Sequence, residues 1–114
     1  MNSLLAIALA TASFFHTTLK SSIPAKDAVV TAPSEVSLTF TEKVNASLSS
    51  IVILKADSSQ VEKLIVTATG DPARIEGAVT TRLSPARYLI RWKTVSADGH
   101  VVRSVFGFTV KPSR

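Results

Sequence analysis

The chain has 114 residues, enough for one domain with an ordinary core that needs no disulfide or metal support. It contains no cysteine, which excludes disulfides, thiolate catalysis and cysteine-ligated zinc or iron–sulfur centres. The formal net charge of +5 is scattered along the sequence without a basic block, so the pattern argues against nucleic-acid binding and favours a solvated surface.

The first fifteen residues carry no charged side chain, whereas every Lys, Arg, Asp and Glu lies at Lys20 or later. An apolar run from Leu4 to Ala10, followed by small residues, is typical of a secretory signal peptide and is too short to span a bilayer. We therefore predict a signal peptide over 1–15 and one exported domain over 16–114. The alternative is a buried first element of a cytoplasmic domain, because the segment before the apolar run lacks the expected Lys or Arg.

From Glu35 onward, apolar and polar residues alternate as in half-buried β-strands. The positions predicted to face the core are Val36, Leu38 and Phe40, then Tyr88, Ile90 and Trp92, then Phe106, Phe108 and Val110. Arg87, Arg91 and Lys93 fall on the opposite face together with Leu89. Two further runs, Ser50 to Ala56 and Lys63 to Thr69, are rich in Val and Ile, which favours strand over helix.

Turn signals separate these runs at 23–27, 32–35, 56–59, 69–73, 83–86 and 97–99. About seven short strands in about 100 residues predict an all-β, antiparallel, immunoglobulin-like Greek-key sandwich. Tyr88 follows the turn LSPA, so we expect its hydroxyl to close on upstream backbone as in a tyrosine corner. We expect Trp92 to anchor the core.

The strand pattern is interrupted in TVSADGHVVRSVFGFTV, where Asp98 and His100 stand two residues apart. In an extended backbone both side chains project to the same side, and Gly99 separates them without filling the space between. The only other histidine is His16. Taken alone, these residues fit an ordinary polar turn better than a metal site, because any surface turn can contain D-G-H.

The order of several segments nevertheless resembles the CopC family of periplasmic copper-resistance proteins. The segments are HTTLKSSIPAKD from His16, APSEVSLTFTEKV from Ala32, and LSPARYLIRWKTVSADGHVVRSVFGFTV from Leu83, so the resemblance covers 17–111. It implies a cupredoxin-like or immunoglobulin-like sandwich that binds Cu(II) through His16, Asp98 and His100. Glu42 matches an acidic residue of the family near this site and would orient a ligand. A CopD-like inner-membrane protein is the implied partner.

The chemistry of this ligand set is consistent with Cu(II). An N-terminal His16 would offer both its α-amine and its ring nitrogen, and three nitrogens with one carboxylate suit tetragonal Cu(II). Cu(I) would require soft sulfur ligands, but the only methionine is Met1. We therefore expect one Cu(II) site, no methionine-rich Cu(I) site and no catalytic activity, in a periplasmic carrier or buffer for copper homeostasis and resistance.

Two alternatives remain open. Phe15 is a poor residue directly before a cleavage site, and cleavage after Ala12 would leave Ser13 at the N-terminus and remove the amine chelate. The chain would then be a metal-free interaction domain. A copper oxygenase would also use an N-terminal histidine and a second histidine, but a bound Asp98 would stabilise the +2 charge and occupy a position that oxygen needs.

Overall fold

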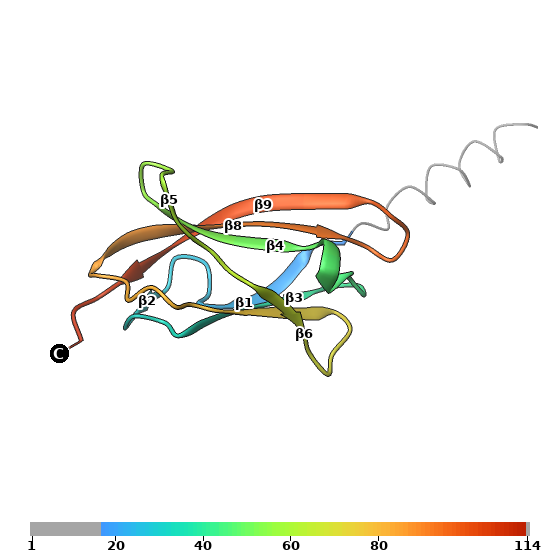
Figure 1. The fold of residues 1–114 in the computed structure, drawn as a ribbon, viewed down its shortest axis with the longest axis horizontal. Helices are drawn as coiled ribbons and strands as arrows, with labels where there is room; N and C mark the ends of the chain where they lie inside the picture. Colours follow the sequence, from blue (N-terminus) through green and yellow to red (C-terminus); the bar gives the residue numbers. More distant parts are fainter. Residues whose placement is uncertain (1–16, 114) are drawn as a thin grey trace, which may run out of the picture.

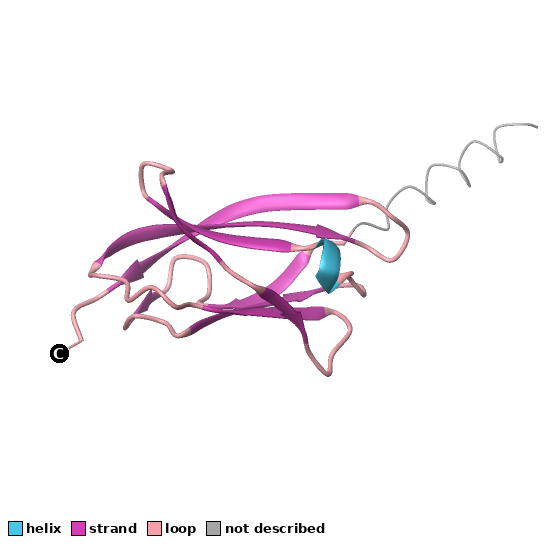
Figure 2. Cartoon of the chain, in the orientation of Figure 1, coloured by secondary structure: helices cyan, strands magenta, loops and turns pink. Residues whose placement is uncertain are grey.

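The structure is a computed structural model that describes residues 17–113. Two β-sheets pack face to face, as the alternating pattern predicted (Figure 1). The four-stranded sheet has the order β1 (Leu19–Ile23), β3 (Glu35–Phe40), β7 (Arg74–Ala78), β6 (Val66–Ala68). The five-stranded sheet has the order β2 (Val29–Val30), β9 (Val101–Val110), β8 (Ala86–Val95), β4 (Ser50–Lys55), β5 (Gln60–Lys63). A single turn of 3-10 helix, η2 (Ala46–Leu48), precedes β4 (Figure 2).

The all-β sandwich is confirmed, with two differences in detail. The described residues form nine strands rather than about seven, because β2 has only two residues and the polar edge strand β1 has no clear alternation. The β2–β9 pair is parallel, whereas the other pairs are antiparallel. No helix within 17–113 has the length and apolar character that a bilayer span requires. The predicted signal peptide, 1–15, lies outside the described residues.

The prediction of one strand from Lys63 to Thr69 is wrong, because the chain changes sheets within this run. β5 ends at Lys63 in the five-stranded sheet, and β6 begins in the four-stranded sheet. Between them Leu64 is buried in the core and Ile65 is exposed. Gly77 of β7 makes this crossing possible, since a Cβ there would lie 2.8 Å from Leu64 Cβ. Periodicity alone does not distinguish a strand from such a crossing.

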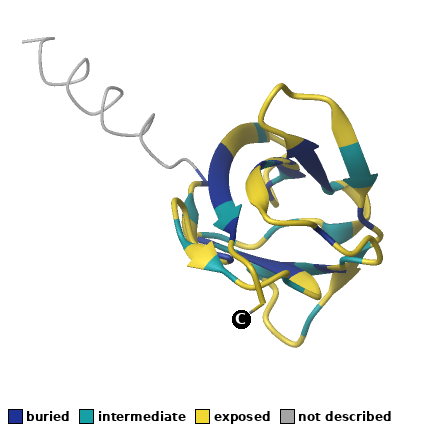
Figure 3. Ribbon diagram, turned by 90° about the vertical axis from the view of Figure 1, so that its left-hand side faces the viewer, coloured by how far each residue is buried: buried dark blue, intermediate teal, exposed yellow. Residues whose placement is uncertain are grey.

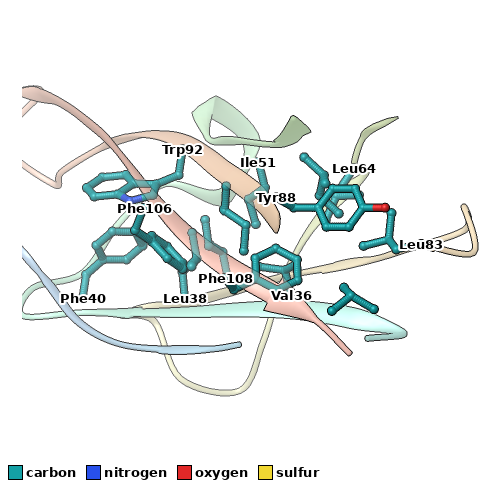
Figure 4. Packing of buried hydrophobic residues seen from close by; sticks show 14 residues of the cluster. Val36, Leu38, Phe40, Ile51, Leu64, Leu83, Tyr88, Trp92, Phe106 and Phe108 are labelled. Carbon is teal, nitrogen blue, oxygen red and sulfur yellow. The ribbon is translucent and has the colours of Figure 1, made fainter. Parts of the chain in front are cut away.

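The core confirms the predicted alternation. All nine apolar residues expected to face inward are buried, and exposed residues lie mainly in the loops and on outer faces (Figure 3). Trp92, Phe40 and Phe106 gather at one end of the core (Figure 4). The rings of Phe40 and Trp92 meet edge to face at 5.1 Å. This aromatic end of the core supports the end of the sandwich where β8 turns into β9.

Tyr88 lies toward the opposite end of the core, near Leu83 and Leu64 (Figure 4). Its hydroxyl donates a hydrogen bond to the Ser84 carbonyl oxygen at 2.7 Å. The expected tyrosine-corner contact is therefore confirmed, and it fixes the loop that leads into β8.

Candidate metal centre

Asp98 and His100 lie in the tight turn that joins β8 to β9. The Gly99 N–H donates to the Ser96 carbonyl at 2.9 Å, and the Ser96 N–H donates to the His100 carbonyl at 2.9 Å. Gly99 has φ 90°, so the loop combines a tight turn with a left-handed residue before the strand resumes. The expectation that Asp98 and His100 share an extended backbone is therefore wrong, because the turn itself brings their side chains together.

The two side chains contact each other directly. His100 Nδ1 lies 2.8 Å from Asp98 Oδ2, and the His100 backbone N–H donates to Asp98 Oδ1 at 3.2 Å. The Ser96 hydroxyl also donates to Asp98 Oδ1. The hydrogen bond from Ser96, followed by those from His100, lowers the pKa of Asp98 from 3.8 to about 2. Asp98 is therefore a carboxylate at any physiological pH.

The contact with Asp98 determines which imidazole nitrogen is available to a metal. A carboxylate accepts the Nδ1 proton, which leaves the lone pair of neutral His100 on Nε2. The ring is well exposed, with 78% of its side-chain surface accessible, so Nε2 is open to an ion from solvent. A carboxylate in this position orients the histidine and makes it a stronger ligand.

Glu42 contacts the beginning of the described chain. Thr17 is 3% exposed, and its hydroxyl donates to Glu42 Oε1 at 3.2 Å. Two hydrogen bonds hold Thr18 to Thr41: the Thr18 N–H donates to the Thr41 hydroxyl, and the Thr41 N–H donates to the Thr18 carbonyl. His16, the predicted third ligand, lies outside the described residues but is covalently joined to Thr17.

Backbone contacts bring the segment after β3 beside the end of β8. Val44 forms an isolated antiparallel bridge with Ser96, and the Asn45 N–H donates to the Val95 carbonyl at 2.9 Å. The β8–β9 turn and the start of β1 lie at the same end of the sandwich (Figure 1). The segments carrying Glu42, Thr17 and the Asp98–His100 pair therefore meet at one end of the molecule.

The described residues supply only part of a metal site. Within 17–113 no group of three His, Cys, Asp or Glu residues is arranged to hold a metal ion. The oxygen of Asp98 and the nitrogen of His100 suit a divalent ion of borderline softness, and a further ligand would have to come from outside this range. The donor atoms of Asp98 and His100 suit a metal ion, and His16 would have to supply the remaining ligands.

Glu42 is not the carboxylate that contacts the His100 ring. Its carboxylate accepts from Thr17, and the acceptor on the His100 ring is Asp98. Sequence reasoning also missed Ser96, whose hydroxyl and carbonyl hold the turn. A Ser two residues before an Asp-Gly pair is a signal for such a turn, because these side chains hydrogen-bond to nearby backbone.

The chain is similar to known proteins along most of its length. The family model described as CopC domain matches residues 19–111. Copper resistance protein C of Xanthomonas campestris pv. juglandis is 35% identical over 115 residues, covering 95% of this chain and 91% of that protein. Copper resistance protein C of Escherichia coli is 29% identical over 114 residues, covering 94% and 90%. The resemblance inferred from the motifs is therefore confirmed across almost all of the described residues.

Solved structures show the same fold. CopC from Methylosinus trichosporium OB3b is similar with a TM-score of 0.80 at 29% identity, covering 87% of this chain and 97% of that chain. PcoC from Escherichia coli, a methionine-rich copper resistance protein, gives a TM-score of 0.72 at 28% identity and covers 85% and 100%. This chain differs from a methionine-rich protein in having a single methionine, Met1.

Proposed function

The chain belongs to the CopC family, and we propose on this premise that it binds one Cu(II) ion as a periplasmic carrier or buffer in copper homeostasis and resistance. The observation that carries the proposal is the direct contact between Asp98 and His100 on an exposed turn. This turn lies at the same end of the sandwich as the start of β1 (Figure 1), the strand that His16 and Thr17 precede in sequence. In this proposal the protein carries copper and does not use it to catalyse a reaction.

We propose that His16 becomes the N-terminus when a signal peptide over 1–15 is removed. The α-amine of residue 16, with a pKa of roughly 8, would lose its proton to a metal easily near neutral pH. The amine and ring of His16, the His100 ring and the Asp98 carboxylate, which would exchange its contact with His100 Nδ1 for the metal, would then supply three nitrogens and one oxygen, a set suited to tetragonal Cu(II). Thr17, buried and bonded to Glu42, would fix the chain next to the ligand.

The same ligand chemistry limits the function. Cu(I) prefers thioether and thiolate sulfur, and a domain over 16–114 contains neither methionine nor cysteine. A carboxylate ligand stabilises the +2 state, which suits storage or transport rather than oxygen activation. We therefore propose a non-catalytic role in which a CopD-like inner-membrane protein receives the ion.

The proposal is tested by titrating Cu(II), against a competing chelator, into protein that begins at His16. We expect one equivalent to bind tightly, and Asp98→Asn to weaken binding at least tenfold because it removes an anionic group from the site. Asp57→Asn is a matched control, since Asp57 lies in the β4–β5 turn and accepts from Ser59 N–H and hydroxyl as Asp98 does from its neighbours. Equal effects of the two changes, or stoichiometric binding of Cu(I) instead, would contradict the proposal.

A further inference from the structure

Basic residues that are scattered in the sequence come together on the outer face of the five-stranded sheet. On β8, Tyr88, Ile90 and Trp92 are buried, so the alternate residues point away from the core. The register places Val105 and Arg103 of β9, Val52 of β4 and Lys63 of β5 on the same outer side, although Val52 itself is buried. The residues that we call the cationic face are Lys63, Arg87, Arg91, Lys93 and Arg103, all of them exposed.

The register arranges these cations in rows across the sheet. One row runs from Lys63 through Val52 and Arg91 to Val105, crossing β5, β4, β8 and β9. In the next row Lys93 pairs directly with Arg103. Neighbouring strands lie about 4.8 Å apart and alternate residues along a strand about 7 Å apart. The charges therefore form a two-dimensional array, unlike the single stripe that follows a nucleic-acid backbone.

Acidic residues do not balance this array. Arg87, at its edge, pairs with Asp27 of the β1–β2 loop at 3.1 Å. Lys63, Arg91, Lys93 and Arg103 form no ion pair with any residue in 17–113. The Lys93–Arg103 pair puts like charges directly opposite each other, which is unfavourable for a sheet. An unbalanced and mutually repelling set of cations is explained by an anionic partner that offsets the repulsion.

The apolar residues of the face indicate what kind of partner fits. Val101 and Val105 point outward and are 53% and 51% exposed. The aromatic residues of the described chain lie in the core instead, namely Phe40, Tyr88, Trp92, Phe106 and Phe108. Specific protein interfaces are anchored by aromatic residues, which this face lacks, whereas binding to an anionic bilayer needs only cations, Lys or Arg alike, near a broad surface. The composition of the face favours a bilayer.

We infer that the cationic face docks on the anionic headgroups of a phospholipid bilayer. Each Lys or Arg near such a surface strengthens binding about fivefold, so the four unpaired cations give weak, reversible and salt-sensitive association. The β8–β9 turn lies at the end of the same two strands, at the perimeter of the docked face. Docking would therefore leave Asp98 and His100 accessible. This inference is independent of copper binding.

The test is co-sedimentation of the full domain with phosphatidylcholine vesicles that contain about 30% phosphatidylglycerol, at about 0.02 M salt. Lys93→Gln with Arg103→Gln removes two charges from the face. Lys20→Gln with Arg82→Gln removes the same charge from β1 and the β7–β8 loop, outside the face. We expect the face variant to lose about 30-fold in vesicle binding and the control variant less than about threefold.

Thermal unfolding provides a second measurement. The face variant should melt no lower than the wild type, because it removes a repulsive cross-strand pair. Equal losses in the two variants would show that only net charge matters and would overturn the inference. Equal binding to vesicles of phosphatidylcholine alone would overturn it as well. Binding to poly-glutamate without binding to vesicles would overturn it in favour of an acidic protein partner.

Discussion

Gly99 holds the two candidate copper ligands together because its backbone conformation is one that other residues rarely adopt. Its φ is 90°, in the left-handed region that favours glycine. Its N–H closes the turn on Ser96, and the chain then returns so that His100 reaches back to Asp98. Space is not the constraint, since a Cβ at residue 99 would meet no atom within 4 Å.

We predict that Gly99→Ala lowers the free energy of unfolding by about 1 kcal/mol, the strain of an L-residue in this region. The relaxed turn should also separate Asp98 from His100 and weaken Cu(II) binding. Gly70→Ala is the control, because Gly70 lies in another turn, has no positive φ and also has open space around it. Urea unfolding and Cu(II) titration measure both effects. Identical results for the two variants would mean that the conformation of Gly99 does not position the site.

The sequence predicted that Asp98 and His100 lie together, but not the geometry of their contact. Side chains two residues apart project to the same face of a strand, and a tight turn with glycine between them can also bring them together. Pairing of Asp98 with His100 is therefore compatible with either geometry. The choice of His100 nitrogen and the part played by Ser96 depend on hydrogen bonds that spacing does not specify. His16 and its link to the site remain a prediction.

The Glu62 carboxylate connects strand β5 to the loop that follows β7. Glu62 accepts from the Thr80 hydroxyl at 2.6 Å, from the Thr80 N–H at 3.1 Å and from the Thr81 N–H at 2.9 Å. Desolvation would raise the pKa of Glu62, but the hydrogen bonds from Thr80 and Thr81 outweigh it and lower the pKa from 4.5 to about 2. This contact fixes β5 just before the chain crosses between the sheets.

The stability contributed by Glu62 should depend on pH. Because its pKa is lower in the folded state, the contribution is complete above pH 4.5 and disappears as the pH falls to about 2. Glu62→Gln should lower the free energy of unfolding at pH 7 by about 1 kcal/mol, a modest amount because the group is partly solvated. Wild type and variant should converge near pH 2. Glu35→Gln, at an exposed carboxylate on β3, should change little, and an effect as large as that of Glu62→Gln would contradict the account.

Strands with clean alternation could be predicted from the sequence, whereas the crossing after β5 could not. In β8 the inward positions are apolar except for the buried Thr94, and the outward positions are mostly charged, so the inward face is clearly specified. From Lys63 to Thr69 apolar residues are consecutive, and no local signal marks the change of sheet at Leu64. The glycine that permits this crossing, Gly77, lies on another strand and is brought near only by the fold.

In the whole molecule, the proposed copper site and most of the cationic face are separate features of the same two strands. β8 and β9 carry Asp98 and His100 at their shared turn and four of the five cations along their outer surface. The sandwich could be predicted from period-two patterning and turn spacing alone. The cationic face could not, because residues as distant in sequence as Lys63 and Arg103 come onto one face only through the strand order and register.

The most direct test of the central claim is the electron paramagnetic resonance spectrum of the protein with one equivalent of Cu(II). We expect protein that begins at His16 to give a single tetragonal signal with nitrogen-rich parameters, and we expect that signal to change in His100→Ala and in protein that begins at Ser13. An identical signal in all three proteins, or the spectrum of unbound Cu(II) in the protein that begins at His16, would contradict a copper site built from the N-terminus and the Asp98–His100 turn.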